Sequence, residues 1–284
     1  MRPLLWLLPI LAATFVWLRV PLDGGSACNE CSAMLLPDLA TMPLPAPVKP
    51  AVERPNLPYP APPPEEQWRQ MPAADRLANV HARVRPLLAQ ELQRQDLKLG
   101  NPAFVRIYKE TRELELWLKG RQGWKLFRTY PVAAMSGVLG PKMQEGDRQA
   151  PEGFYGFSAS ALNAGSTFHL SFNIGYPNAH DRHHGRTGTH IMVHGNQVSI
   201  GCFAMTDPVI EEIYLVVEAA LEKNGGEVPV HVFPFRMNAE RLAQETGHPS
   251  HAFWQDLLPL HDAFEKEAKV PRVDLKGGRY VMAR

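Results

Sequence analysis

The distribution of proline is the sequence feature that most constrains how this chain can fold, because it divides the 284 residues into unequal parts. Most of the excess among the 27 prolines lies early, from Pro37 to Pro64. Proline lacks a backbone N–H and fixes φ, so a stretch punctuated in this way is typical of an extended, polyproline-like spacer. We therefore expect residues 28–64 to be a linker and the folded part to follow it.

An apolar run precedes the linker, between Arg2 and Leu18. At about 16 residues it suits the core of a signal peptide better than a full membrane span, which needs about 20. We expect residues 1–27 to be either a cleaved signal peptide or a retained N-terminal membrane anchor, and in both cases the rest of the chain is exported. The formal net charge of +1 gives no reason to expect a nucleic-acid partner.

Cysteine usage singles out one residue of the folded part. Cys28 and Cys31 lie before the proline-rich stretch, and we expect them to be an incidental or locally disulfide-bonded pair, which leaves Cys202 alone after the linker. A single thiol in an exported protein is a liability unless it is buried or used. Cys202 is therefore a candidate nucleophile.

The stretch from His190 to Asp207 supports this interpretation. Apolar alternation ends at His194, the chain turns at Gly195, and Ser199-Ile-Gly201-Cys202 follows. An imidazole near a thiol is the commonest way to obtain a thiolate, and Gly201 leaves room for a carbonyl substrate whose oxyanion backbone N–H groups would hold. The pattern predicts a cysteine acyltransferase or amidase, with Ser199 and Gly201 beside the nucleophile.

The rest of the folded part alternates between strand and helix patterns. We expect an N-terminal helical segment at 65–100, a catalytic domain at 101–236 and a C-terminal helical extension at 237–284. Asp207 is expected to cap a helix whose first residue is Pro208. The expected elements are a helix at 73–99, strands at 104–108, 114–118, 124–130, 168–172, 190–194 and 228–235, long loops at 136–156 and 175–188, and helices after 207, at 238–246 and at 250–268.

The motifs Val193-His194-Gly195 and Ser199-x-Gly201-Cys202 resemble those of the YkuD-type L,D-transpeptidase catalytic domain family. The stretches 178–188 and 198–207 look most like the YafK or DpaA branch of that family. The resemblance implies a mainly β catalytic core of sandwich or barrel type with flanking helices, α+β overall. It also implies Cys202 as nucleophile, His194 as base and the Gly195 carbonyl as the group that orients the imidazole, with no metal and no cofactor.

The resemblance further implies a periplasmic enzyme of cell-wall biogenesis and cell shape that acts on peptidoglycan stem peptides containing diaminopimelate. In the general family the product is a 3-3 cross-link, whereas in the branch the implied reaction is hydrolytic release of a peptidoglycan-bound outer-membrane lipoprotein. The residues alone leave this choice open.

The chain departs from the family pattern beside the nucleophile. Ile200 stands where the family has a second histidine, Ala204 stands where an arginine is common, and the gap between His194 and Cys202 is short. We expect the missing positive charge and the substrate contacts to come from Arg182, His184, Arg186 and Asn173.

Two other interpretations remain open. A metal hydrolase of the cell wall would use several histidines with Asp181, because zinc favours such ligands. Those histidines are His180, His183, His184, His190 and His194. A non-catalytic peptidoglycan-binding module would instead leave Cys202 merely buried.

Overall fold

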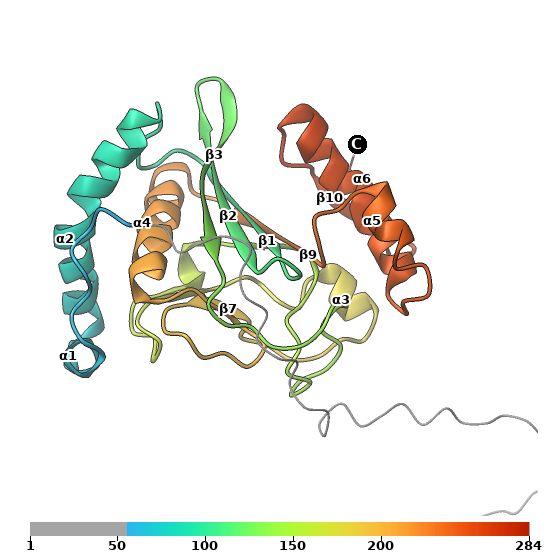
Figure 1. Cartoon of the computed structure of the whole chain (residues 1–284), viewed down its shortest axis with the longest axis horizontal. Helices are drawn as coiled ribbons and strands as arrows, with labels where there is room; N and C mark the ends of the chain where they lie inside the picture. Colours follow the sequence, from blue (N-terminus) through green and yellow to red (C-terminus); the bar gives the residue numbers. More distant parts are fainter. Residues whose placement is uncertain (1–55, 284) are drawn as a thin grey trace, which may run out of the picture. The chain divides into compact units, whose positions relative to one another are not determined.

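A five-stranded sheet occupies the centre of the computed structural model, which describes residues 56–283 (Figure 1). Its strand order is β3-β2-β1-β9-β4, and β9 runs parallel to β1 and antiparallel to β4. The strands expected at 104–108, 114–118 and 124–130 form an antiparallel meander. The strands are β1 (Ala103–Tyr108), β2 (Glu113–Gly120), β3 (Gly123–Pro131), β4 (Gly153–Phe157) and β9 (Val228–Phe233).

A second sheet of four short strands carries the stretch around His194. Its order is β5-β6-β7-β8, with β7 antiparallel to β6 and parallel to β8. The strands are β5 (Leu162–Asn163), β6 (Ser171–Asn173), β7 (Met192–His194) and β8 (Phe203–Ala204), and a single 3-10 turn, η1 (Ala159–Ala161), precedes β5. Helix α4 (Asp207–Asn224) contacts strands of both sheets, so it joins them through a shared apolar core.

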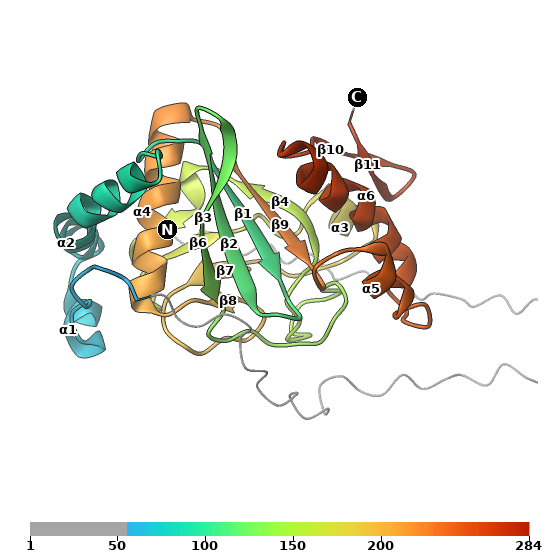
Figure 2. The ribbon, with the colours of Figure 1, turned by 45° about the horizontal axis from the view of Figure 1, so that its top comes forward.

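The remaining helices lie on opposite sides of the five-stranded sheet (Figure 2). Helix α2 (Ala73–Arg94) packs against α4, and α1 (Glu65–Gln70) precedes it. On the other side, α5 (Ala239–Ala243), α6 (His251–Glu267) and the hairpin of β10 (Val273–Lys276) and β11 (Arg279–Met282) enclose a second apolar cluster. Because both faces of the sheet are covered, every residue of β1 is buried.

The α+β class with flanking helices is confirmed, and several element boundaries differ from the prediction. Helix α2 runs through Pro86 and ends at Arg94. The loop expected at 175–188 contains α3 (Ala179–His183), whose capping box joins Asn178 and Asp181. Thr206, rather than Asp207, occupies the N-cap of α4. The hairpin β10–β11 was not expected within the C-terminal extension.

The expected signal peptide or anchor, the Cys28–Cys31 pair and residues 28–55 of the expected linker lie outside the described residues. The last part of that linker is described and packs against the fold. Leu57 and Tyr59 contact the main apolar core, and Arg83 donates a hydrogen bond to the carbonyl oxygen of Pro60 (2.6 Å). Among the helices of residues 56–283, none is long and apolar enough to cross a membrane.

Candidate active site

Strand β7 carries His194, and Cys202 lies in the bend that leads into β8, the strand paired with β7. His194 pairs in register with Ala204, and Cys202 lies two residues before Ala204. The Cys202 thiol lies beside the backbone of Met192, which is two residues before His194 on β7.

The hydrogen bond of the His194 ring defines which nitrogen acts as base. Nδ1 lies 2.6 Å from the carbonyl oxygen of Gly195. A carbonyl only accepts, so Nδ1 carries the proton and Nε2 keeps its lone pair. Burial lowers the pKa of His194, against smaller raising effects of the Gly195 bond and the charge of Asp207. The ring also stacks on Phe168, with centroids 4.7 Å apart.

The Cys202 thiol is partly buried and is held by backbone groups of the neighbouring strand. Its Sγ accepts from the N–H of Met192 (3.4 Å) and donates to the carbonyl oxygen of His190 (3.5 Å). Burial raises the pKa of Cys202, while the Met192 N–H and the charge of Lys142 lower it. Within residues 56–283, no hydrogen bond joins this sulfur to His194. The resting pair is therefore a neutral thiol and a neutral imidazole.

Gly195 allows the turn after His194 to pack tightly. A Cβ at this position would lie 2.5 Å from Asp207 Oδ1 and 2.7 Å from the carbonyl oxygen of Phe168. Asp207 accepts the N–H of Asn196 at Oδ1 (2.7 Å) and the indole N–H of Trp68 at Oδ2 (3.1 Å). Asp207 thus anchors the turn from the start of α4. Both of its carboxylate oxygens accept hydrogen bonds from outside the helix, and its side chain therefore does not cap α4.

The loop before Cys202 is held by two side-chain bonds. The N–H of Gly201 donates to Ser136 Oγ (2.7 Å), and Ser199 Oγ donates to the carbonyl oxygen of Cys202 (2.6 Å). Gly201 has φ +89°, a backbone conformation that favours glycine. Because Ser136 already accepts the Gly201 N–H, this group is engaged in loop structure rather than pointing free toward a substrate.

The four expected substrate-binding residues lie in different environments. Arg186 is buried in an ion pair with Asp181 (2.8 Å), and His184 donates from Nε2 to the carbonyl oxygen of Gly278 (2.8 Å). Arg182 donates to the carbonyl oxygen of Pro177. These three side chains are engaged in local contacts of α3 and of the C-terminal hairpin.

Asn173 differs from those three residues, because it lines a groove that they do not line. It lines a groove of about 560 Å³ together with His190 and Met192, both of which contact Cys202 through their backbone. Cys202 itself does not line this groove, but two residues whose backbone holds its sulfur do, and we therefore regard it as the candidate substrate groove.

Lys142 is the cation that sequence reasoning missed. Its charge lowers the pKa of Cys202, and its Nζ is held by Asp147 Oδ1 (2.5 Å) and the carbonyl oxygen of Gln144 (2.9 Å). The available signal was its position in the long polar loop at 136–156, where functional residues are common. Its distance of 60 positions from Cys202 in the sequence gave no indication that the two lie near each other.

The histidines required for a metal site do not converge. Throughout residues 56–283, no group of three or more His, Cys, Asp or Glu side chains is placed to hold a metal ion. The rings of His180 and His184 lie 4.4 Å apart, but His180 stacks on Tyr280 while His184 bonds Gly278. His194 is separately engaged with Gly195.

Comparison with known proteins bears on the family to which the chain belongs. Residues 102–232 match the model of YkuD, the L,D-transpeptidase catalytic domain. The chain is 40% identical over 186 residues to a protein of Escherichia coli K12 described as "Putative L,D-transpeptidase YafK". The match covers 66% of this chain and 76% of YafK, and the values are the same for the O157:H7 strain.

Among solved structures, the cell-shape-determining protein Pgp2 of Campylobacter jejuni (K307A mutant) aligns at a TM-score of 0.40 and 20% identity, covering 70% of this chain and 65% of Pgp2. Bd1075 of Bdellovibrio bacteriovorus aligns at a TM-score of 0.33 and 22% identity, covering 48% and 49% of the two chains. This chain spans slightly less than two thirds of the length of the Pgp2 structure. From the YkuD match and the extent of identity with YafK, the chain belongs to the L,D-transpeptidase catalytic domain family.

Proposed function

We propose that this chain is an exported, periplasmic cysteine acyltransferase that acts on diaminopimelate-containing stem peptides of peptidoglycan. Cys202 is the nucleophile and His194 the base. The observation that carries the proposal is the bond from His194 Nδ1 to the Gly195 carbonyl, because it leaves Nε2 as an acceptor on β7, the strand whose Met192 N–H holds Cys202 Sγ.

The reaction begins from neutral groups. His194 Nε2 takes the thiol proton as Sγ forms a bond to the stem-peptide carbonyl, and the imidazolium then returns the proton to the leaving amine. We assign the developing oxyanion to the N–H of Cys202, because the Gly201 N–H is bonded to Ser136. Lys142 favours the negative charge that develops in this region. The product is an acyl thioester on Cys202.

The second half-reaction decides the biological outcome. Transfer of the acyl group to the amine of another stem peptide gives a 3-3 cross-link, and transfer to water frees the stem peptide as a carboxylic acid, because the amine to which its carbonyl was joined has already left in the first half-reaction. A peptidoglycan-bound outer-membrane lipoprotein is the candidate substrate for hydrolysis. The groove lined by Asn173, His190 and Met192 is the candidate stem-peptide site for both outcomes.

The decisive experiment incubates the full chain, or its Cys202→Ala variant, with sacculi that still carry bound lipoprotein, and identifies products by mass spectrometry. Cysteine-dependent release of lipoprotein would establish hydrolysis, and cysteine-dependent 3-3 dimers would establish transpeptidation. Identical products from the two proteins would refute the thiol mechanism and leave the binding-module interpretation.

A further inference from the structure

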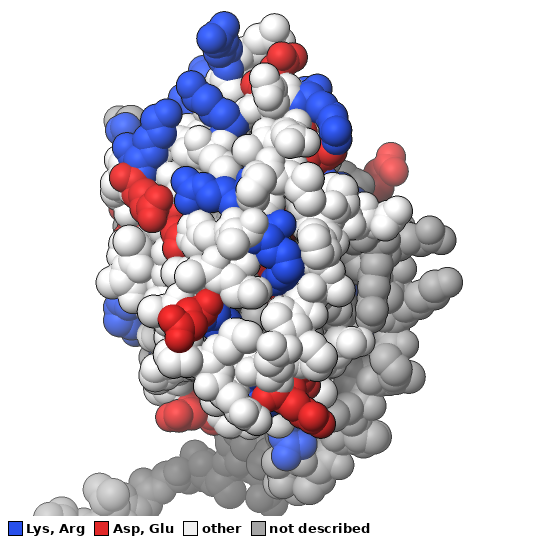
Figure 3. All heavy atoms as spheres, turned by 90° about the vertical axis from the view of Figure 1, so that its left-hand side faces the viewer, with Lys and Arg blue, Asp and Glu red and all other residues white. Residues whose placement is uncertain are grey.

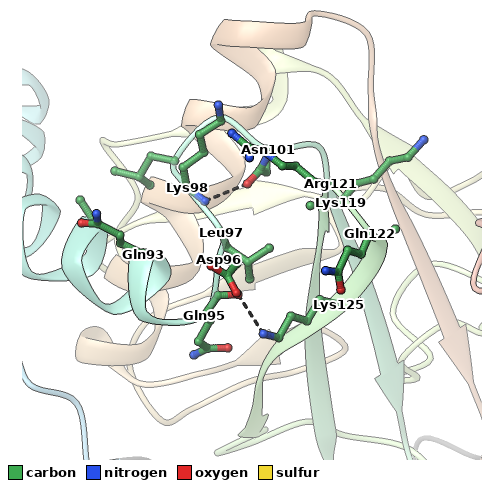
Figure 4. Close-up of a pocket in the computed structure, with 14 residues that line it drawn as sticks. Gln93, Gln95, Asp96, Leu97, Lys98, Asn101, Lys119, Arg121, Gln122 and Lys125 are labelled. Carbon is green, nitrogen blue, oxygen red and sulfur yellow. Dashed lines mark hydrogen bonds between the residues drawn. The ribbon is translucent and has the colours of Figure 1, made fainter.

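A second groove lies far from Cys202 in the fold, between the end of α2 and the β2–β3 hairpin (Figure 4). Its volume is about 840 Å³, larger than that of the groove beside Cys202. Figure 1 shows the hairpin at the top of the molecule and β7 in its lower part. The two grooves share no lining residue, so we call this one the distal groove and define it by Gln95, Asp96, Lys98, Lys119, Arg121 and Lys125.

The distal groove concentrates positive charge. Four cations line it, against the single carboxylate of Asp96. All four side chains are exposed. Within residues 56–283, none of the four forms an ion pair, and Lys125 bonds only the carbonyl oxygen of Gln95 (2.8 Å). Like charges gathered in a concave surface reinforce one another's potential, so this groove attracts anions.

This concentration is a local property rather than a consequence of a basic chain. The formal net charge of the whole sequence is only +1. Elsewhere on the surface, Arg and Lys side chains on helices have carboxylate partners, as in the pairs Arg69–Glu65, Arg241–Glu110 and Lys266–Asp262. In Figure 3, Lys and Arg side chains gather toward the top of the face that carries α2, the same end of the molecule as the hairpin.

The lining also includes amide side chains that suit a polymer of sugars and peptides. Gln93, Gln95 and Gln122 each offer a donor and an acceptor beside the cations, and Asn101 offers the donors of its amide group, because its Oδ1 accepts the Lys98 N–H (2.8 Å). A concave polar groove does not fit a flat bilayer, where binding requires apolar side chains that project into the lipid. The lining therefore favours an extended, hydrated polyanion over a membrane surface.

We propose that the distal groove binds the free carboxylates of peptidoglycan stem peptides, as a site separate from that of Cys202. The inference rests on the proposed peptidoglycan substrate. Lys and Arg side chains form charge-assisted hydrogen bonds with carboxylates, and a second attachment point on the same polymer raises the effective concentration of stem peptides at Cys202. The groove thus retains the enzyme on its insoluble substrate.

The test compares two variants of the full chain with the same loss of charge. The test variant carries Lys98→Gln, Lys119→Gln, Arg121→Gln and Lys125→Gln. The control carries Lys266→Gln, Lys269→Gln, Arg272→Gln and Lys276→Gln, which are also three lysines and one arginine, all exposed, on the C-terminal part of the chain. Sedimentation with purified sacculi measures binding at low and high salt, and a soluble stem peptide measures turnover.

We expect the test variant to bind sacculi about tenfold more weakly at low salt, with a smaller loss at high salt, because exposed charges each contribute modestly and are screened. The control variant should bind as the unmodified chain does, and turnover of the soluble peptide should be the same for all three. Sacculi whose carboxylates have been converted to amides should bind the unmodified chain as weakly as intact sacculi bind the test variant.

Unchanged binding by the test variant, or an equal loss in the control, would overturn the proposal. So would full binding of the unmodified chain to amidated sacculi. The same sedimentation assay with vesicles of anionic phospholipid tests a membrane surface. If the test variant loses binding to these vesicles but not to sacculi, the proposal is overturned in favour of a membrane surface. The Cys202→Ala variant should bind sacculi as the unmodified chain does, because Cys202 does not line the distal groove. If the unmodified chain binds sacculi but shows no turnover, the proposed function is refuted while the proposed binding at the distal groove is retained.

Discussion

At the scale of single residues, burial opposes the charged form of both proposed catalytic groups. It raises the pKa of Cys202 and lowers that of His194, because each charged form loses hydration. The site therefore differs from cysteine enzymes that rest as a thiolate–imidazolium pair. Proton transfer to His194 accompanies attack on the substrate, and the Gly195 carbonyl holds the ring in the tautomer that this transfer needs.

The protonation state of Cys202 predicts its reactivity toward an alkylating agent. Only the thiolate reacts, and the pKa of this thiol lies above its ordinary value, so the reactive fraction grows with pH throughout the neutral range. We expect the alkylation rate of the folded protein to rise about tenfold per unit between pH 7 and pH 8.5. Mass spectrometry of the modified Cys202 peptide measures this rate. A rate that is already maximal at pH 6 would indicate a preformed ion pair instead.

Burial lowers the pKa of His194 and so extends the pH range downward, and the charge of Asp207 opposes part of that effect. That charge raises the pKa of His194, so Asp207→Asn should lower the pKa further. Because the base must be neutral, the acidic limb of the kcat/KM profile should move to lower pH. We expect the plateau rate to fall about threefold, since a less basic imidazole is a weaker general base. An acidic limb that stays in place would show that Asp207 acts on the turn alone.

At the scale of elements, helix α1 reaches the turn after His194 through Trp68. Its indole N–H bonds Asp207 Oδ2, while its ring contacts His169 (centroids 5.0 Å apart) and the guanidinium of Arg76 (4.8 Å). Arg76 in turn donates to the carbonyl oxygens of Ser166 and His169. The segment before the catalytic domain therefore supports the proposed active site.

Trp68→Phe should separate this support from simple packing. Phenylalanine keeps an aromatic ring but removes the N–H, so we expect a loss of about 1 kcal/mol in unfolding free energy. Turnover should fall about fivefold with the acidic limb of the pH profile unmoved, because the Asp207 charge remains. Trp117→Phe is the matched control, since its indole N–H bonds Glu115 Oε2 (2.9 Å), away from Cys202. Equal turnover losses in both variants would contradict a positioning role for Trp68.

At the scale of the whole molecule, a buried ion pair joins four segments. Lys109 Nζ, just after β1, contacts Glu152 Oε1 (2.9 Å) and the carbonyl oxygens of Gly140 (2.7 Å) and Ala150 (2.9 Å). Glu152 Oε2 accepts the indole N–H of Trp254 on α6 (2.7 Å). The loop between Gly140 and Ala150 carries Lys142, so the C-terminal helices are linked to the surroundings of Cys202.

Breaking this pair should destabilise the whole fold. Lys109→Met leaves the Glu152 carboxylate buried without its cation, which costs about 3–5 kcal/mol of unfolding free energy. The double variant Lys109→Met, Glu152→Gln removes both charges and should recover part of that loss. Denaturant unfolding measures both variants. A single variant as stable as the unmodified chain would show that water reaches Glu152.

Some features followed from local sequence alone. The meander of β1 to β3, the helix α4 up to Gly225 and the candidate pair of His194 and Cys202 all depend on periodicity, on turn residues or on motifs within a few positions. The α+β class followed from the resemblance that those motifs carry. Such features are encoded in short stretches, because neighbouring residues alone determine their backbone and spacing.

Other features were decided only when distant segments met. The roles of Trp68, Lys142 and Asp207 around the site depend on contacts over 139, 60 and 11 positions from their partners, and no local pattern records them. Arg186 forms an ion pair with Asp181, and His184 forms a hydrogen bond with the carbonyl oxygen of Gly278. The sequence determined which chemistry the chain carries. Tertiary packing decided which charged groups were neutralised inside the fold and which stayed free to act, because burial makes an unpaired charge costly.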